Sequence, residues 1–474
     1  MIFSTYSFIF IFLPIVFLGF RLLSHFKLHF WAKLWLVIAS VYFYAQGSGS
    51  FTIIFIIDMC VNLMLGNLMI KSGNAGRNGL KRLLLAAGLT LNILFLGYYK
   101  YANFMIDNVN MITGQAYGLV NIVLPLGISF YTFQLIAYLV DSYRGTAKPT
   151  PAIDFFLFIT FFPQLIVGPI VHHAEVLPQY QDNKQRLFNA SNIMLGLFLF
   201  SIGCAKKIML ADPLTNYSQQ FFANISAGDT LTAWLSSVGY TLSYYFDLSG
   251  YADMAIGLAL LFNIRLPQNF NSPYKARNFR EYWNRWHMTL SRFLSDYVFR
   301  SVYRKGKGSF NFYSAVMITF FVSGFWHGAG WEFVLWGVIN GVFVCMSHFM
   351  YRKKWKLPFI LAWVITFAGV VGTRILFVSD NLPHALEVMK MMFVWKEYGV
   401  GNAVYYQFLT FGAYHLYTIV LLAIAMIIAF FAPNSSEITK DFKPRYRYAF
   451  AAAFLLGISL TQMTSVSKFL YFQF

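Results

Sequence analysis

The stretch SGFWHGAGW, residues 323–331, places one histidine between two long apolar runs at residues 311–325 and 330–350. An imidazole in such a segment is costly unless it has a partner or a chemical task, because a bilayer offers it no water. Histidine is also the side chain best suited to moving a proton near neutral pH. The glycines around His327 leave room for close approach. The stretch therefore predicts chemistry inside a membrane.

The composition of the whole chain indicates the same class of protein. Of 474 residues, 58% are hydrophobic, 20% aromatic and only 11% charged, whereas soluble proteins carry about 25% charged residues. Apolar runs long enough to cross a bilayer of about 30 Å recur from end to end, and they lack the alternation of a β-barrel. We expect an all-α polytopic membrane protein. The candidate spans lie near residues 5–23, 30–46, 50–70, 82–99, 118–140, 153–171, 191–211, 231–262, 311–325, 330–350, 357–378, 404–432 and 448–467.

Two of these runs contain residues that interrupt helices. The 118–140 run holds Pro125 and Gly127, and the 153–171 run holds Pro163 and a Gly-Pro pair. Irregular backbone at membrane depth is tolerated only where protein or a cavity surrounds it, so we expect broken or re-entrant helices there. The chain is predicted to be a single membrane-embedded domain, 1–474, made of N-terminal spans (1–117), a catalytic core (118–350) and C-terminal spans with an external tail (351–474).

The net charge of +18 comes largely from short basic loops between the spans, such as 71–82, 352–356 and 440–447. This distribution indicates topology signals, so we expect membrane lipid and no nucleic acid as a partner. The positive-inside rule puts these loops in the cytoplasm and both termini outside. The first apolar run lacks the charged start and cleavage site of a signal peptide. We predict a multi-pass protein of the bacterial inner membrane.

Residues 274–307 differ from the rest, because basic and aromatic residues alternate there at helical spacing. The segment predicts one basic amphipathic helix lying along the cytoplasmic interface. One interpretation is a surface anchor. The other is that Arg280, Arg285 and Arg292 line the mouth of a pocket that receives an anionic donor.

Other polar residues in apolar sequence have simpler explanations. Asp247 and Asp253 are six residues apart and lie on different faces of a straight helix, although Gly250 could break it. Pairing with Arg or capping is favoured over catalysis for both, and Asp58 is interpreted as structural. The adjacent imidazoles of His172-His173 are expected to point apart, without a third ligand. We therefore predict no metal site.

Several ordered motifs carry a resemblance to a known family. They are FDLSGYADMAIG (246–257), NF (269–270), PY (273–274), EYWNRWH (281–287) and WHG (326–328). Together they resemble the membrane-bound O-acyltransferase (MBOAT) family across essentially the whole chain. PLGISFY (125–131) and the tail FLYFQF (469–474) are similar to the branch containing the alginate O-acetyltransferase membrane subunit. Relatives in that branch acetylate peptidoglycan, cellulose and other surface polymers, and a more distant one carries D-alanine toward teichoic acids.

The resemblance implies a helical bundle around a central funnel with a thin floor, and it matches His327 and His287 to the family's two histidines. Acyl transfer from a thioester to a hydroxyl needs a base and donors for the developing oxyanion. His327 is predicted to be the general base, with Ser323 one helical turn before it and Trp331 one turn after. Cationic neighbours should lower the pKa of His287. The residues predicted to position donor or acceptor are His287, Asn284, Arg280, Arg285, Arg292, Trp326 and Asp247.

We therefore expect an O-acetyltransferase that takes acetyl from a cytoplasmic thioester, with acetyl-CoA as the expected donor, and delivers it outward to a polysaccharide. No bound cofactor is expected. The family association implies a periplasmic partner of the SGNH-hydrolase type. Tyr471 in the external tail is either an aromatic anchor or an acyl relay, since a phenol can accept and release an acetyl group. The alternatives are a transporter or flippase of a lipid-linked saccharide, with buried His and Asp as a proton relay, and a non-catalytic scaffold of a secretion complex.

Overall fold

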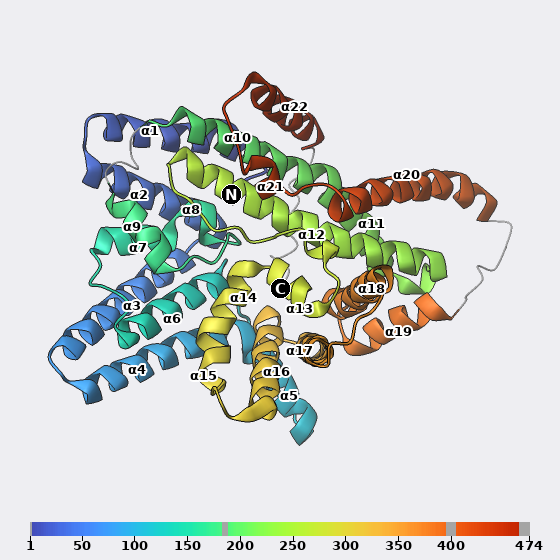
Figure 1. Cartoon of the computed structure of the whole chain (residues 1–474), viewed down its shortest axis with the longest axis horizontal. Helices are drawn as coiled ribbons and strands as arrows, with labels where there is room; N and C mark the ends of the chain where they lie inside the picture. The colour runs from blue at the N-terminus through green and yellow to red at the C-terminus, as the bar shows by residue number, and fades with distance from the viewer. Residues whose placement is uncertain (1, 183–187, 395–403, 464–474) are drawn as a thin grey trace.

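The computed structural model describes residues 2–182, 188–394 and 404–463, with side chains except at 227 and 404–415. These residues form helices and connecting turns, with no strand among them (Figure 1). Within the described ranges, seven helical segments are long and apolar enough to cross a membrane. The prediction of an all-α multi-pass membrane protein is confirmed. The segments are Phe8–His25, Phe51–Asn74, Asn78–Thr113, Ala190–Ala223, Gly308–His327, Trp331–Arg352 and Phe359–Val378.

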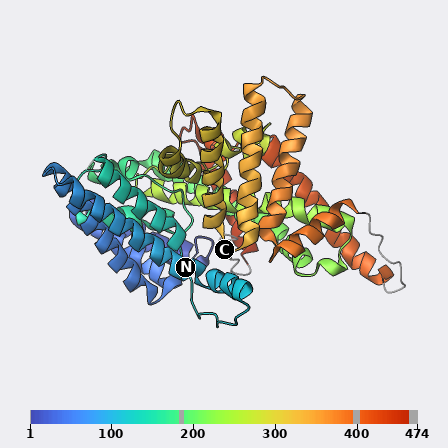
Figure 2. The same ribbon diagram turned by 90° about the horizontal axis from the view of Figure 1, so that it is seen from below.

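The N-terminal helices form a tilted bundle on one side of the molecule (Figure 2). Its elements are η1 (Phe8–Phe12), α1 (Leu13–His25), α2 (His29–Ser48), α3 (Phe51–Asn74) and α4 (Asn78–Leu96). The chain continues through η2 (Gly97–Tyr101) to α5 (Ala102–Thr113), which lies apart from the bundle near α16 (Figure 1). A buried polar chain joins α3 to α4, because Asn92 donates to the side chain of Asn62 at 2.7 Å and Asn62 donates to Asp58 at 2.9 Å. Asp58 thus takes a structural role, as expected.

The two apolar runs that contain Pro and Gly, 118–140 and 153–171, do not form continuous helices in the structure. The helix expected from residue 118 begins only at Ile128, after Gly127 with φ of +70°, so its predicted start is wrong by ten residues. The run 153–171 divides into two short helices followed by buried irregular chain, which confirms the expected break. The elements are α6 (Ile128–Arg144), α7 (Ala152–Thr160), α8 (Phe162–Leu165) and α9 (His173–Gln181).

The long helix α12 (Thr230–Leu261) forms the centre of the molecule and is buried along most of its length. It packs on α10 (Ala190–Ala205) through facing glycines: a Cβ on Gly257 would lie 2.5 Å from the carbonyl oxygen of Gly196, and one on Gly250 would lie 2.8 Å from that of Gly203. Of the two alternatives left open for Gly250, the structure shows the straight helix, because α12 runs through this residue. Glycine there permits backbone contact between two helices.

The two acids on α12 pair with lysines of η4 (Lys206–Ala211), which follows α10 directly. After η4 come α11 (Asp212–Ala223) and η5 (Ile225–Ala227), and then α12. Asp247 lies 2.6 Å from Lys207, and Asp253 lies 2.6 Å from Lys206. Pairing with a cation is confirmed, with lysine in place of the expected arginine. Two adjacent lysines thus neutralise carboxylates two helical turns apart.

The single amphipathic helix predicted over 274–307 is wrong. Trp286 is extended and His287 is left-handed, with φ of +43°, so the backbone cannot continue as one helix. The apolar side of the segment also faces protein, since Tyr282, Trp286 and Leu290 are each 2% exposed. The observed elements are η6 (Pro273–Lys275), α13 (Phe279–Arg285), α14 (Met288–Leu294), η7 (Ser295–Phe299) and α15 (Arg300–Val302).

The remaining helices complete the bundle, with α17 and α18 standing upright beside the tilted N-terminal helices (Figure 2). Because α16 ends at His327 and the chain turns over the next three residues, Trp331 starts a new helix. The expected position of Trp331, one turn after His327, is therefore wrong. The elements are α16 (Gly308–His327), α17 (Trp331–Arg352), α18 (Phe359–Val378), α19 (Leu382–Phe393), α20 (Val404–Phe430), α21 (Ser435–Thr439) and α22 (Tyr446–Gln462).

Candidate active site

His327 is the last residue of α16 and is 4% exposed. Its ring meets Trp326 and Trp336 edge to face, with centroids 4.9 Å away in each case, and meets Phe377 at 5.3 Å. Three aromatic rings thus restrict its orientation. It also interacts electrostatically with His287, Lys100 and Arg374, so charged and titratable groups from separate elements converge on one imidazole.

The end of α16 is held by η2. The ammonium of Lys100 donates to the backbone carbonyls of Trp326 and His327 at 2.7 and 2.9 Å, and the Tyr101 hydroxyl donates to that of Phe325 at 2.6 Å. The last carbonyls of a helix have no partner within it, so these bonds satisfy them. Trp326 is fixed separately, because its indole donates to the carbonyl of Ser129 at 3.3 Å.

His287 joins α13 to α14 and is 3% exposed. Burial lowers its pKa to about 3, so the imidazole is neutral at physiological pH. The expected direction is confirmed, but the cause differs: removal from water, and not cationic neighbours, disfavours the charged form. A neutral imidazole beside the His327 site can accept or donate one hydrogen bond.

Arg374 on α18 interacts electrostatically with His327 and is 3% exposed. Its guanidinium is 4.1 Å from the ring centroid of Tyr244, 5.0 Å from that of Trp286 and 5.1 Å from that of Phe377. No carboxylate pairs with it in the part of the chain that the structure describes. Aromatic faces stabilise a cation but do not neutralise it, so a positive charge is available beside His327.

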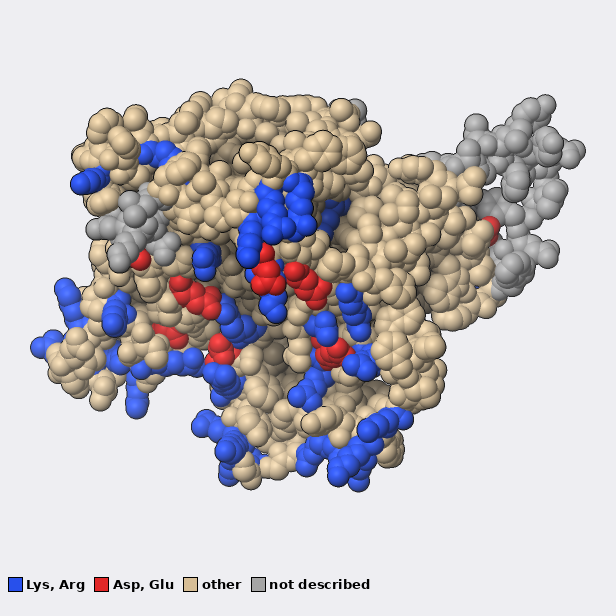
Figure 3. All heavy atoms as spheres, turned by 45° about the horizontal axis from the view of Figure 1, so that its top comes forward, with Lys and Arg blue, Asp and Glu red and all other residues tan. Residues whose placement is uncertain are grey.

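A cavity of about 260 Å³ lies between the basic segment and α16. Its lining includes Arg280 and Asn284 of the basic segment and Ser323, one helical turn before His327. A second cavity of about 460 Å³ shares Trp283 and Asn284 with it and adds Arg292. In the face shown in Figure 3, Lys and Arg side chains lie around a hollow with Asp and Glu side chains among them. The two cavities thus bring basic residues of the 274–307 segment close to the turn of α16 that precedes His327.

The three arginines expected to meet donor phosphates differ in their surroundings. Arg285 pairs with Glu281 at 2.9 Å, and Arg292 forms a two-bond pair with Glu175. Arg280 lies over the ring of Tyr351 at 5.0 Å and has no carboxylate partner within the described residues. Of the three, Arg280 is thus the one whose charge faces the first cavity without compensation.

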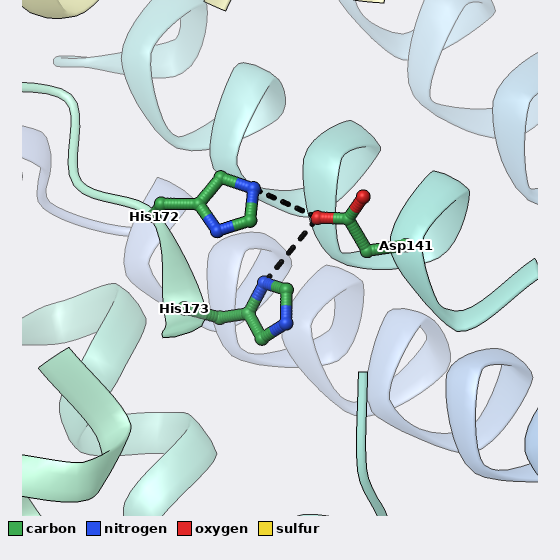
Figure 4. A group of neighbouring side chains, drawn as sticks. All are labelled: Asp141, His172 and His173. Carbon is green, nitrogen blue, oxygen red and sulfur yellow. Dashed lines mark ion pairs between the residues drawn. The ribbon is translucent and has the colours of Figure 1, made fainter. Parts of the chain in front are cut away.

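Other predicted site residues lie elsewhere. Asp247 is fully buried and holds Lys207, which also reaches Asp212 at 2.8 Å, so it is not among the cavity-lining residues. Tyr471 lies outside the described residues. The expectation that His172 and His173 point apart without a third ligand is wrong, because both rings turn toward the carboxylate of Asp141 (Figure 4).

Sequence reasoning missed Lys100 and Arg374. Both are cations within apolar runs, Lys100 in GYYKY (97–101) and Arg374 in the run 357–378. The argument that drew attention to His327, that a polar group at membrane depth needs a task, applies equally to them. The signal was therefore present in the sequence.

The chain is similar to one protein family and to several named proteins. The sequence pattern of the membrane-bound O-acyltransferase family matches residues 135–379. A peptidoglycan O-acetyltransferase of Helicobacter pylori is 36% identical over 100% of this chain and 98% of its own. A probable alginate O-acetylase of Pseudomonas aeruginosa is 37% identical over 83% of this chain and 75% of its own. A teichoic acid D-alanyltransferase of Bacillus subtilis is 31% identical over 56% and 71%, respectively.

Proposed function

The chain belongs to the membrane-bound O-acyltransferase family, and from that premise we propose that it moves acetyl groups from cytoplasmic acetyl-CoA to an extracytoplasmic polysaccharide. It is a multi-pass membrane enzyme. The finer assignments are the donor, the acceptor and the role of His327. One observation carries them: the same cavity is lined by Arg280 and Asn284 and by Ser323, one turn from His327.

The cavity suggests how the donor binds. Arg280 at its entrance meets the phosphates of acetyl-CoA, because a guanidinium pairs well with phosphate oxygens. Asn284 lies between both cavities and positions the pantetheine arm. The thioester then reaches the turn of α16 that precedes His327. The basic face around the hollow is cytoplasmic by the positive-inside rule, and both termini lie outside.

The residues around His327 suggest the chemistry. His327 removes the proton from the attacking hydroxyl, the new C–O bond forms at the acetyl carbonyl, and the C–S bond breaks to release coenzyme A as the thiol after it takes up that proton. Arg374 supplies the positive charge for the oxyanion that develops on the carbonyl oxygen. His287, neutral and close by, holds the donor or acceptor in line. The aromatic rings around His327 exclude competing water.

Peptidoglycan is the first acceptor to test, since the peptidoglycan O-acetyltransferase aligns over nearly its full length, whereas the probable alginate O-acetylase aligns over three quarters. A periplasmic partner of the SGNH-hydrolase type completes transfer to the polymer. The inner membrane is the compartment that gives access to both acetyl-CoA and the wall.

The test compares His327→Ala with His25→Ala, an exposed histidine at the end of α1, in a strain lacking the chromosomal copy. O-acetyl content of purified peptidoglycan is measured by mass spectrometry, and thiol release from acetyl-CoA is measured in membranes. We expect His327→Ala to abolish both while the protein accumulates normally and His25→Ala to keep both. Thiol release without any polymer acetyl would point to another acceptor. Full activity of His327→Ala would indicate that the protein is a non-catalytic scaffold. Polymer transport without thiol release would indicate that it is a transporter.

A further inference from the structure

A cluster of metal-ligating side chains lies apart from His327, where three elements meet. Asp141 is near the C-terminal end of α6, His172 is the residue before α9, and His173 is its first residue. Their ligand atoms all lie within 4.8 Å of one another. His172 Nε2 is 2.8 Å and His173 Nδ1 is 3.5 Å from the same carboxylate oxygen of Asp141 (Figure 4).

The start of a helix explains why adjacent histidines face the same way. His172 is extended, with φ of −92° and ψ of 137°, whereas His173 begins the helical turn. In a continuous strand the two rings would point to opposite faces, but the change of conformation between them brings the ring centroids to 4.6 Å. The local backbone thus aims two imidazoles at one carboxylate.

Hydrogen bonds alone leave this cluster poorly satisfied. The Tyr297 hydroxyl from η7 lies 2.7 Å from Asp141 Oδ2 and 2.5 Å from His172 Nε2. If the Tyr297 hydroxyl donates to Asp141, a proton on His172 Nε2 faces both the Tyr297 oxygen and Asp141 Oδ2. One proton then serves two acceptors. His173 Nδ1 is buried without a hydrogen-bond partner, and an unpaired buried nitrogen costs about 1–3 kcal/mol. The nitrogen and oxygen lone pairs of the cluster outnumber the protons available to bond with them. A bound cation would take up the lone pairs that remain.

We propose that Asp141, His172 and His173 bind a divalent transition-metal ion, with zinc as the best fit. Two imidazoles and one carboxylate are ligands that zinc accepts, with a fourth position left for water. Ligand atoms about 2.0 Å from a tetrahedral ion lie about 3.3 Å apart, and the two separations from Asp141, 2.8 and 3.5 Å, lie on either side of that value. Tyr297 orients the carboxylate by its hydrogen bond, as partners of metal ligands commonly do.

The ion would have a structural task beside the donor entrance. Through Asp141 and the two histidines it joins α6 to α9, and through Tyr297 it holds η7. Ser295 of η7 lines both cavities, and Glu175 of α9 binds Arg292, which lines the second one. A metal at this junction therefore fixes two walls of the entrance. His172 is 27% exposed at its side chain, which gives the ion a path to the site.

The test uses the full-length protein in detergent. After chelation and dialysis it is reloaded with Zn²⁺ for elemental analysis or with Co²⁺, whose visible absorption reports nitrogen and oxygen ligation. We expect the wild type to bind one metal ion per protein molecule. His172→Ala and Asp141→Asn should each bind the metal with an affinity lower by about tenfold or more. His25→Ala should bind as the wild type does. Tyr297→Phe keeps all three ligands and should retain the Co²⁺ spectrum with moderately weaker binding.

The variants are chosen so that misfolding does not decide the result. His172 is partly exposed, so its alanine variant should elute from size exclusion as the wild type does. If the three residues form only a hydrogen-bonded cluster, the reloaded wild type will hold no more Zn²⁺ or Co²⁺ than His172→Ala does. That outcome overturns the proposal. Equal loss of metal in His25→Ala would also overturn it. Acetyl transfer is not the readout, so the metal site and the proposed function fail separately.

Discussion

The ammonium of Lys100 donates a hydrogen bond to the backbone carbonyl of His327 at 2.9 Å, across 227 positions of the chain. The proposed base is therefore held through its backbone by a residue of the N-terminal half, while its ring is held by aromatic residues of the C-terminal half. Lys100 also binds the carbonyl of Trp326. The end of α16 is thus fixed from outside its own helix.

Replacing Lys100 with Met should leave two buried carbonyls without donors and should destabilise the protein by about 1–3 kcal/mol. The loss of position at His327 should also lower activity by about tenfold or more, because small displacements of catalytic groups are costly. Melting in detergent and thiol release from acetyl-CoA would be measured. Lys71→Met, at an exposed lysine on α3, is the matched control. Wild-type activity in Lys100→Met would contradict the positioning role.

Arg374 should act on the turnover number and not on donor affinity. If its charge stabilises the oxyanion, Arg374→Met should lower kcat by about 10²–10³-fold with little change in KM. Arg374→Lys keeps a charge but loses the planar stack over Tyr244 and Trp286, so partial activity is expected. Steady-state kinetics on purified protein with its partner would measure both. A rise in KM alone would assign Arg374 to donor binding.

Arg280 and Arg285 give a matched pair for the donor site. Arg280→Gln should raise the KM for acetyl-CoA by about tenfold, the value of one charge-assisted hydrogen bond. Arg285→Gln should change it little, because Arg285 already pairs with Glu281. Thiol release at varied acetyl-CoA concentration would measure this. Equal effects in both variants would indicate a membrane-surface role for the whole basic segment.

His287 should make folding sensitive to acid. Its pKa is about 3 in the folded protein and 6.5 when exposed, so between these values the unfolded chain binds more protons. The free energy of unfolding is therefore highest above pH 6.5 and falls by up to about 1.4 kcal/mol per pH unit as pH decreases toward 3. His287→Gln should show a shallower fall between pH 6.5 and 5. Melting temperatures across that range would measure the difference, and parallel curves would contradict it.

Tyr471 remains a prediction from sequence. Tyr471→Phe keeps the aromatic ring and removes only the hydroxyl, so it separates an acyl relay from an anchor. If Tyr471 relays acetyl, Tyr471→Phe should lose both polymer acetylation and thiol release from acetyl-CoA, because no hydroxyl remains to accept the acetyl group. Intact mass of the wild type with donor and no acceptor should then show an added acetyl group on the C-terminal peptide. Normal acetylation by Tyr471→Phe would leave the tail an anchor.

Much of the fold could be predicted from apolar length, because a helix in lipid must satisfy its own backbone. The long apolar helix that contains Ser323 and the interruption of the 153–171 run followed from local sequence. The 274–307 segment did not, since its periodicity suited one helix while the left-handed backbone at His287 is imposed by tertiary packing. The convergence of Lys100, Arg374 and His327 joins residues far apart in the chain, which no local pattern encodes.

The facing glycines of α10 and α12 have a consequence for how the protein sits in its bilayer. The backbones of the two helices touch at two places, seven residues apart on each, and a change of side-chain rotamer cannot relieve a contact between backbones. The two helices cannot slide or rotate past each other without steric clashes, so they move as one rigid unit. When membrane thickness changes with lipid composition, the mismatch must be absorbed by tilting of the peripheral helices. The contact between α10 and α12 is therefore expected to keep its geometry when the lipid composition changes.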